Sequence, residues 1–179
     1  PRPGQRRGHH RCSAAQRGAE RIRFGNGMEQ DITAFRKDLL GRIKRVVIKV
    51  GSSVLTGGTD DLNGGVFSNM VSCISRLRHS GREVVLVSSG AIAAGKKSLR
   101  CVERPTSIPQ KQASAAIGQV RLMARYEACF RRHGRQIAQV LLTSDDLSNR
   151  RKFLNARNTL FTLLECGIIP IINENDSVV

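Results

Sequence analysis

The chain has 179 residues, of which 40% are hydrophobic, only 4% are aromatic and none is Trp. This length allows one ordinary domain, and an aliphatic composition of this kind is typical of parallel sheets covered by helices. Thirty Lys and Arg against fourteen Asp and Glu give a net charge of +16, so nucleic acid has to be considered as a partner. Seven of the Arg lie in residues 1–27, and the excess charge is therefore partly confined to one end.

The cysteine pattern and the apolar runs bear on the cellular compartment. The five cysteines are widely spaced and form no Cys-x-x-Cys pair, which argues against a disulfide framework or a zinc site and indicates a reducing compartment. No apolar run reaches the roughly 18 residues of a membrane span, and the Arg-rich start lacks the apolar centre of a secretion signal. We therefore expect a cytoplasmic protein with no membrane partner, and we assign no metal-ligating residues.

The first part of the chain differs in composition from everything after it. Residues 1–27 show no apolar periodicity, and the first Met is Met28. We interpret this stretch as a disordered basic tail or as translated upstream sequence that is not native to the protein. From Met28 onward, apolar residues including Phe35 and Leu39 recur at helical spacing, which predicts a short amphipathic helix. The predicted organisation is a tail over 1–27 and a domain over 28–179.

Strand and helix patterns alternate over the rest of the chain, with no hairpin signal between consecutive strands. The predicted strands cover 45–51, 83–90, 136–143 and 168–173. The predicted helices cover 66–81, a stretch from about 91, then 109–134 and 151–167, and three of them end at a glycine. Pro170 is expected near the start of the last strand or at an irregularity. This order predicts an α/β fold with a mostly parallel sheet and helices on both faces.

Small, polar and charged residues gather where the strands end, and ligands of open parallel sheets bind beyond that edge. In KVGSS, Lys49, Gly51 and Ser52 bring a cation and backbone N–H groups to one place, a pattern suited to phosphate although the common nucleotide-binding motifs are absent. In VSSGA, Ser89 and Gly90 precede a helix start, where free amides favour an anion. Each loop taken alone also has a structural interpretation. Lys49 could be a solvated surface residue, and Ser89 could be only the N-cap of the following helix.

The last predicted strand leads into INEND, which places Asn173 and Asp176 at the same edge of the sheet. A carboxylate there suits an ammonium group or a metal, and it equally suits a turn cap. The pair Asp145–Asp146 has the same ambiguity. We interpret it as helix capping, because it stands just before a helical stretch.

Five segments together resemble the glutamate 5-kinases, a branch of the amino acid kinase family. They read IKVGSSVLTGG, LVSSGAIAAGKKSL, KQASAAIGQVRLMARYE, FLNARNTL and PIINENDSV, and the resemblance covers residues 45–179. It implies ATP- and Mg²⁺-dependent phosphorylation of the γ-carboxylate of L-glutamate, the first step of proline biosynthesis. It also implies a three-layer sandwich, of which this chain holds the N-terminal lobe, and a homo-oligomer at full length.

The resemblance assigns roles to the strand-end residues. Lys49 becomes the catalytic residue, because its charge would lie at the transferring end of ATP. The implied sites are Lys49, Gly51 and Ser52 for ATP, and Ser89, Gly90, Asn173 and Asp176 for glutamate. The family's Gly-Asp-Asn-Asp stretch and adenine-binding half do not follow in this sequence, so we expect a fragment that is inactive by itself.

Two alternatives remain open from the sequence. Another amino acid kinase, such as an acetylglutamate, aspartate or uridylate kinase, shares the Lys-x-Gly opening, although SSGAIAAG with INEND favours the glutamate 5-kinases. A non-catalytic basic fragment that binds nucleic acid is the other class, suggested by the charge. One Tyr and six Phe give it few stacking residues, so nucleic acid is not the expected partner.

Overall fold

The computed structural model describes residues 26–59, 61–99 and 105–178, with side chains from residue 34 onward within those ranges. Its contacts divide the chain into two compact units, residues 1–41 and residues 42–179. Helix α1 covers Asn26–Arg42, so the predicted first helix is present and begins at Asn26 rather than Met28. Sequence periodicity locates a helix end only to within one or two residues. Of the tail predicted over residues 1–27, residues 1–25 lie outside the described residues, and the last two belong to α1 instead.

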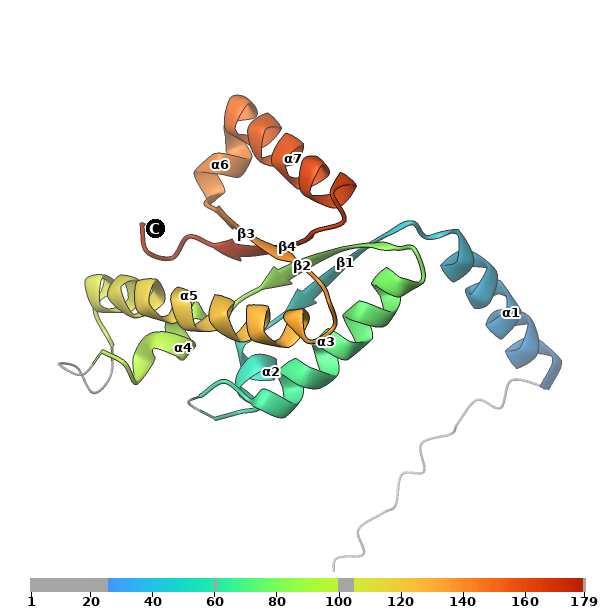
Figure 1. Ribbon diagram of the computed structural model, residues 1–179, viewed down its shortest axis with the longest axis horizontal. Helices are drawn as coiled ribbons and strands as arrows, with labels where there is room; N and C mark the ends of the chain where they lie inside the picture. The colour runs from blue at the N-terminus through green and yellow to red at the C-terminus, as the bar shows by residue number, and fades with distance from the viewer. Residues whose placement is uncertain (1–25, 60, 100–104, 179) are drawn as a thin grey trace, which may run out of the picture. The chain divides into compact units, whose positions relative to one another are not determined.

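In the second unit, strand and helix alternate in the predicted order (Figure 1). The strands are β1 (Arg45–Val50), β2 (Glu83–Ser88), β3 (Ile137–Leu142) and β4 (Ile169–Glu174). The helices are α2 (Ser52–Thr56), α3 (Gly64–His79), α4 (Ala91–Lys96), α5 (Ile108–Arg131), α6 (Ser144–Ser148) and α7 (Arg150–Glu165). Periodicity does not predict α2 or α6, because five residues give too few repeats of a helical pattern.

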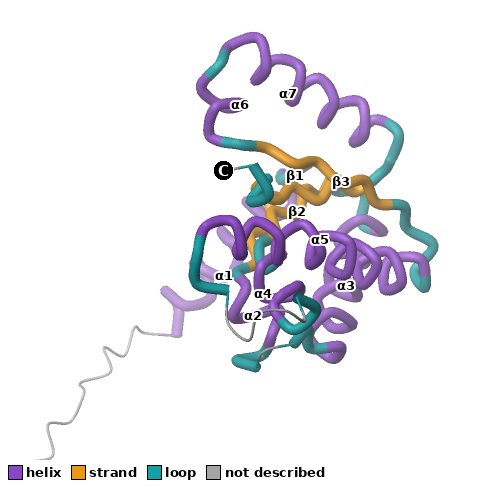
Figure 2. The backbone as a smooth tube through the Cα atoms, turned by 90° about the vertical axis from the view of Figure 1, so that its left-hand side faces the viewer, coloured by secondary structure: helices purple, strands orange, loops and turns teal. Residues whose placement is uncertain are grey.

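The four strands form one parallel sheet in the order β1-β2-β4-β3. Its register places Lys49, Val87 and Ile172 in one row across three strands. Helices α6 and α7 lie on one face of the sheet and α3, α4 and α5 on the other (Figures 1 and 2). The predicted parallel α/β sheet with helices on both faces is therefore confirmed.

Pro170 determines where the central strand β4 begins to pair with β2. The N–H of Ile169 donates to the carbonyl of Gln136 at 3.0 Å, on the β3 side. Because successive N–H groups of a strand point to opposite sides, Pro170, which has no N–H, faces β2. Pairing with β2 begins only at Ile171, opposite Leu86. The predicted position of Pro170 near the strand start is confirmed, since no hydrogen bond to β2 is required there.

Glycine ends α3, α5 and α7 in the same way, each time shortly before a strand. After α3, Gly81 and the next residue donate their N–H groups to the carbonyls of Arg78 and Leu77, which is the double hydrogen bond of a Schellman cap. Gly134 and Gly167 make the corresponding bonds after α5 and α7. All three glycines have positive φ, a conformation that costs other residues more. The predicted glycine ends of these helices are confirmed.

Helices α4 and α5 cross in backbone contact. A Cβ added to Gly95 would overlap the carbonyl oxygen of Ser114, and one added to Gly118 would overlap the carbonyl oxygen of Ala91. The small residues of the predicted helix 109–134 are therefore explained by a close neighbour. The crossing also holds the start of α4, and with it the loop 88–90 at the end of β2.

The core beneath the sheet is centred on Tyr126 of α5. Its ring centroid lies 4.9 Å from that of Phe67 and 6.3 Å from that of Phe130. The phenol oxygen lies 2.9 Å from the Oγ of Ser88, which is buried at the end of β2. Burial raises the pKa of Tyr126 to about 12, although the hydrogen bond with Ser88 lowers it. The phenol is therefore neutral near pH 7 and satisfies the buried hydroxyl of Ser88.

The α4–α5 crossing predicts that Gly118→Ala destabilises the protein strongly. The added methyl meets backbone atoms that cannot rotate away, so we expect a loss of about 3 kcal/mol or more. The melting temperature, followed by circular dichroism, should fall by roughly 6–12 °C.

Gly41→Ala is the matched control, because it is the same change in a helix where nothing lies within 4 Å of the added Cβ. Alanine is the better helix former, so the melting temperature of this variant should stay the same or rise slightly. Wild-type stability of Gly118→Ala would contradict the close crossing.

Candidate functional site

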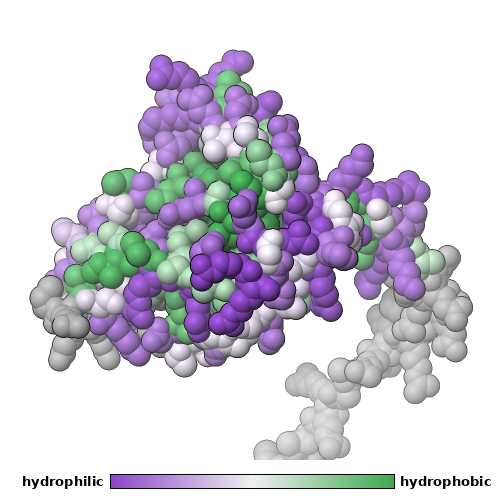
Figure 3. Space-filling model, in the orientation of Figure 1, coloured by the Kyte–Doolittle hydropathy of each residue, from purple (hydrophilic) through white to green (hydrophobic). Residues whose placement is uncertain are grey.

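A cleft of about 790 Å³ opens at the carboxyl ends of the strands, where ligand sites of open α/β sheets form. Its volume is within the usual range for small-molecule sites. Figure 3 shows apolar surface gathered between the α6–α7 side and the α4–α5 side of the visible face. The charged residues that line the cleft are Lys49, Lys96, Glu174 and Asp176. The cleft therefore combines apolar walls with two cations and two carboxylates.

Most of the residues predicted from the sequence line this one cleft. They are Lys49, Ser52, Ser89, Gly90, Asn173 and Asp176. Gly51 does not line it but lies beside it, since a Cβ added to Gly51 would be 4.0 Å from the Nζ of Lys49. The parallel register brings these residues together, because it places the carboxyl ends of β1, β2 and β4 at one edge.

Lys49 presents a positive charge to the cleft. It precedes the last residue of β1, and its side chain is exposed. In the described part of the chain, Lys49 makes no side-chain hydrogen bond or ion pair. A cation without a carboxylate partner can neutralise an anionic ligand such as a phosphate group.

The loops that follow β1 and β2 contact each other. The Oγ of Ser89 donates to the carbonyl of Val50 at 3.3 Å. Gly90 has a φ of 102°, and a Cβ added there would lie 3.6 Å from the Cα of Ser52. Ser89 thus uses its proton inside the protein, and its oxygen remains able to accept from a donor. The left-handed backbone and the close approach both explain why position 90 is a glycine.

The predicted helix from about residue 91 is present after Gly90, and it is short. Helix α4 has six residues, and Gly90 caps it without a side-chain hydrogen bond. A helix macrodipole is the sum of aligned peptide dipoles. Because α4 has few of them, its N-terminus attracts an anion only weakly. Any attraction at this loop comes mainly from individual N–H groups and from the nearby lysines.

Asn173 is held in place by the long helix α5. It is 3% exposed, and its Nδ2 donates to the Oε1 of Gln119 at 2.7 Å. The Nε2 of Gln119 is itself buried and has no hydrogen-bond partner among the described residues. Sequence reasoning missed Gln119, for which the one signal was a polar residue among the small residues of α5. The orientation of the Asn173 amide is therefore determined by a residue of α5.

Asp176 is a carboxylate in an unfavourable environment. Burial raises the pKa of its carboxyl, and the charge of Glu174 raises it further. No hydrogen bond or ion pair to this carboxyl occurs within residues 105–178 or the other described ranges. The turn that contains Asp176 is closed by a backbone hydrogen bond, in which the N–H of Val178 donates to the carbonyl of Asn175 at 3.2 Å. No hydrogen bond among the described residues supports the interpretation of Asp176 as a turn cap. Its negative charge is suited to binding a cationic group.

Two charged residues of the cleft were not predicted. Lys96, at the end of α4, and Glu174, the last residue of β4, both line it. The signals available in the sequence were the GKK at residues 95–97 and the Glu of INEND. Neither pattern shows by itself which way a side chain points.

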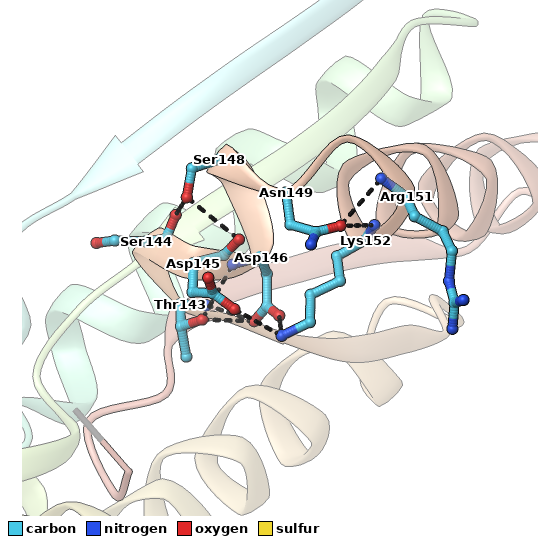
Figure 4. Close-up of polar contacts among 8 residues, drawn as sticks. All are labelled: Thr143, Ser144, Asp145, Asp146, Ser148, Asn149, Arg151 and Lys152. Carbon is cyan, nitrogen blue, oxygen red and sulfur yellow. Dashed lines mark hydrogen bonds and ion pairs between the residues drawn. The ribbon is translucent and has the colours of Figure 1, made fainter.

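The pair Asp145–Asp146 has a structural role (Figure 4). Thr143 and Asp146 form a reciprocal capping box at the start of α6. Lys152 of α7 lies 2.7 Å from a carboxylate oxygen of Asp145 and 3.3 Å from one of Asp146. The hydrogen bonds with Thr143 lower the pKa of Asp146, and those with the two carboxylates raise the pKa of Lys152. The predicted capping is confirmed for Asp146, whereas Asp145 pairs with Lys152.

The profile of the amino acid kinase family matches residues 44–179, a range that includes every residue of the cleft. This chain belongs to the amino acid kinase family. Similar curated relatives are the glutamate 5-kinases of Geobacter metallireducens, Syntrophotalea carbinolica and Geobacter sp. strain M21, which are 57%, 59% and 55% identical over 144 residues. Each alignment covers 80% of this chain and 38–39% of the relative. The chain thus spans about 39% of the length of the curated relatives it matches.

Among the described residues, no helix has both the length and the apolar character needed to cross a bilayer.

The raised pKa of Asp176 predicts a pH-dependent effect on stability. The folded state binds this proton more tightly than the unfolded state, so ionisation lowers stability as pH rises from the ordinary value of 3.8 through the raised folded value. The penalty is absent below that window and fully present above it. Asp176→Asn should therefore raise the melting temperature at pH 7, on the order of a degree, and change it little at pH 3.

Glu165→Gln removes the same charge at an exposed position and serves as the control. An equal rise in both variants would assign the effect to net charge instead of to Asp176. A lower melting temperature of Asp176→Asn at pH 7 would mean that the ionised carboxylate stabilises the fold.

Proposed function

We propose that this chain supplies the glutamate-binding and phosphate-handling part of a glutamate 5-kinase. The proposed reaction transfers the γ-phosphoryl group of ATP to the γ-carboxylate of L-glutamate and yields L-glutamyl 5-phosphate, the first step of proline biosynthesis. The proposal rests on 55–59% identity to relatives of that name. Because the chain spans about 39% of their length, the activity is proposed for the whole protein.

The proposed chemistry needs positioning and charge neutralisation more than proton transfer. The γ-carboxylate is already ionised at neutral pH, so no general base is required. One of its oxygens attacks the γ-phosphorus while the bond to the bridging oxygen of ADP breaks. Lys49 would neutralise charge on the transferring group, and the N–H groups at Gly51 and Ser52 would approach the phosphates. The uncompensated charge of Lys49 in the cleft supports this role.

The other side of the cleft is proposed to hold glutamate. Asp176 would pair with the α-ammonium group, since its carboxyl lies in the cleft without a partner among the described residues. Ser89, Gly90 and Asn173 would contact the remaining polar atoms of the substrate. Their common lining of one cleft supports the assignment.

Magnesium is proposed to enter with the nucleotide, as Mg·ATP. Within the described residues, no group of three or more His, Cys, Asp or Glu could hold a metal ion. Magnesium in phosphoryl-transfer sites needs only one or two carboxylates, because phosphate oxygens and water complete its shell. Glu174 lines the cleft, so one carboxylate is available to an ion delivered in this way. A cytoplasmic location and a homo-oligomer of the whole protein complete the proposal.

The proposal is tested in a chimera in which residues 44–179 replace the matching segment of the Geobacter metallireducens relative. We expect ADP formation that depends on L-glutamate, with an acyl phosphate that hydroxylamine traps. Lys49→Met should lower kcat by roughly a hundredfold or more and change the KM for glutamate little, because its charge acts in the transition state. Lys111→Met, the same change at an exposed position of α5, should keep the kinetics of the parent chimera.

Two outcomes would contradict this proposal. Turnover of acetylglutamate or aspartate, and not of glutamate, would show that the proposed substrate is wrong. An unchanged kcat in Lys49→Met would remove Lys49 from the transfer site.

Asp176→Asn in the same chimera should act on glutamate and not on ATP. The change keeps the shape of the side chain but removes a charge-assisted hydrogen bond, which contributes about 1.5–3 kcal/mol. The kcat/KM for glutamate should therefore fall roughly tenfold to a hundredfold, with little change in the KM for ATP. Normal glutamate kinetics would leave Asp176 without a role in substrate binding, and a defect confined to ATP would mean that the two substrates are placed the wrong way round.

A further inference from the structure

A second cleft lies away from the candidate active site, on the side of the sheet where β2 and β3 begin. It measures about 280 Å³ and is formed by one face of α3 and by the turn between α5 and β3. Its lining residues are Ser72, Ser75, Arg76, His79, His133 and Arg135. The four from α3 follow helical spacing and therefore share one face of that helix.

The lining of this cleft consists of hydrogen-bond donors. Two guanidinium groups, two imidazoles and two hydroxyls contribute to it, and none of the described residues that line it is acidic. Among the described residues, the guanidinium of Arg76 makes only a weak contact, with the Sγ of Cys73 at 3.5 Å. The composition is therefore complementary to an anion.

Two of the donors are buried without a partner. Ser75 is 7% exposed, and its Oγ makes no hydrogen bond within the described residues, not even to the carbonyl one turn earlier in α3. The Nε of Arg135 is likewise buried and unpaired. Buried polar atoms are nearly always hydrogen-bonded. Two residues that line one cleft thus each hold a buried donor without a partner in the described chain, which points to a ligand that supplies acceptor oxygens.

We propose that this cleft binds a phosphate group, either as free phosphate or as part of a small phosphorylated molecule. The planar fork of a guanidinium matches phosphate oxygens, and hydroxyl and imidazole donors can complete the set. The volume admits one phosphate with a small substituent but no larger ligand. The site is separate from the proposed transfer site, and the proposal does not depend on the proposed function.

The test is isothermal titration of the 179-residue chain with inorganic phosphate, at constant ionic strength set with sodium chloride. All proteins carry Lys49→Met, so that the candidate active site contributes as little as possible. We expect saturable binding near one equivalent. Arg76→Gln, at an exposed position that should tolerate the change, should weaken it by about tenfold or more. Arg132→Gln, an exposed arginine outside the cleft, should leave the affinity unchanged.

Ser75→Ala provides a second readout, which a merely structural serine would not give. Removal of an unpaired buried hydroxyl should raise the melting temperature in the absence of phosphate, while the affinity for phosphate falls. A titration with glycerol 3-phosphate separates the two sources of the ligand. Tighter binding than inorganic phosphate supports a phosphorylated small molecule, and equal or weaker binding supports free phosphate.

Three results would overturn the proposal. They are the absence of saturable binding, an equal loss of affinity in Arg76→Gln and Arg132→Gln, and an affinity that Ser75→Ala and Arg76→Gln both leave unchanged. The second would assign binding to diffuse attraction by the +16 chain, and the third would place the phosphate elsewhere.

Discussion

The backbone contact between α4 and α5 at Gly95 and Gly118 is the constraint on which the candidate active site depends. Because no side chain separates the two helices, α5 fixes the start of α4 and the loop 88–90. The same helix supplies Tyr126 to the buried hydroxyl at the end of β2 and Gln119 to the buried amide near the end of β4. One helix thus positions two of the strand ends that form the cleft, and a shift of α5 would move both.

Asp146 and Asp176 lie in opposite environments, and the difference indicates which of them has a structural role. Asp146 is hydrogen-bonded in a capping box and paired with Lys152, and its pKa is lowered. Asp176 has no such partner in the described residues, and burial raises its pKa. A carboxylate that lowers stability when it ionises is more readily explained by a ligand than by the fold. Lys49, near the end of β1 and separated from β4 by β2, is the complementary charge of the cleft without a partner among the described residues.

The excess of basic residues is partly used inside the protein. Arg78 donates to the carbonyls of Arg82 and Gly167 at 2.9 and 3.0 Å, which ties α3 to the turn before β4. Arg121 donates to the carbonyl of Ala94 at 2.8 Å and so joins α5 to α4. Arginine suits this use because its guanidinium offers several donors in a fixed plane. The net charge of +16 therefore does not by itself indicate a nucleic-acid surface.

The sequence by itself determined the alternation of strands and helices, the glycine ends of α3, α5 and α7, and the strand ends as the place of the cleft. These features follow from local periodicity and from the backbone freedom of glycine, which neighbouring residues reveal. Only the tertiary structure decided that β4 lies between β2 and β3, and that Asn173 meets Gln119, 54 positions away. It also decided that Asp176 is partly buried and has no partner among the described residues. Such contacts join residues that are far apart in the sequence. Local patterns cannot predict them, because they indicate how one segment folds but not which other segment packs against it.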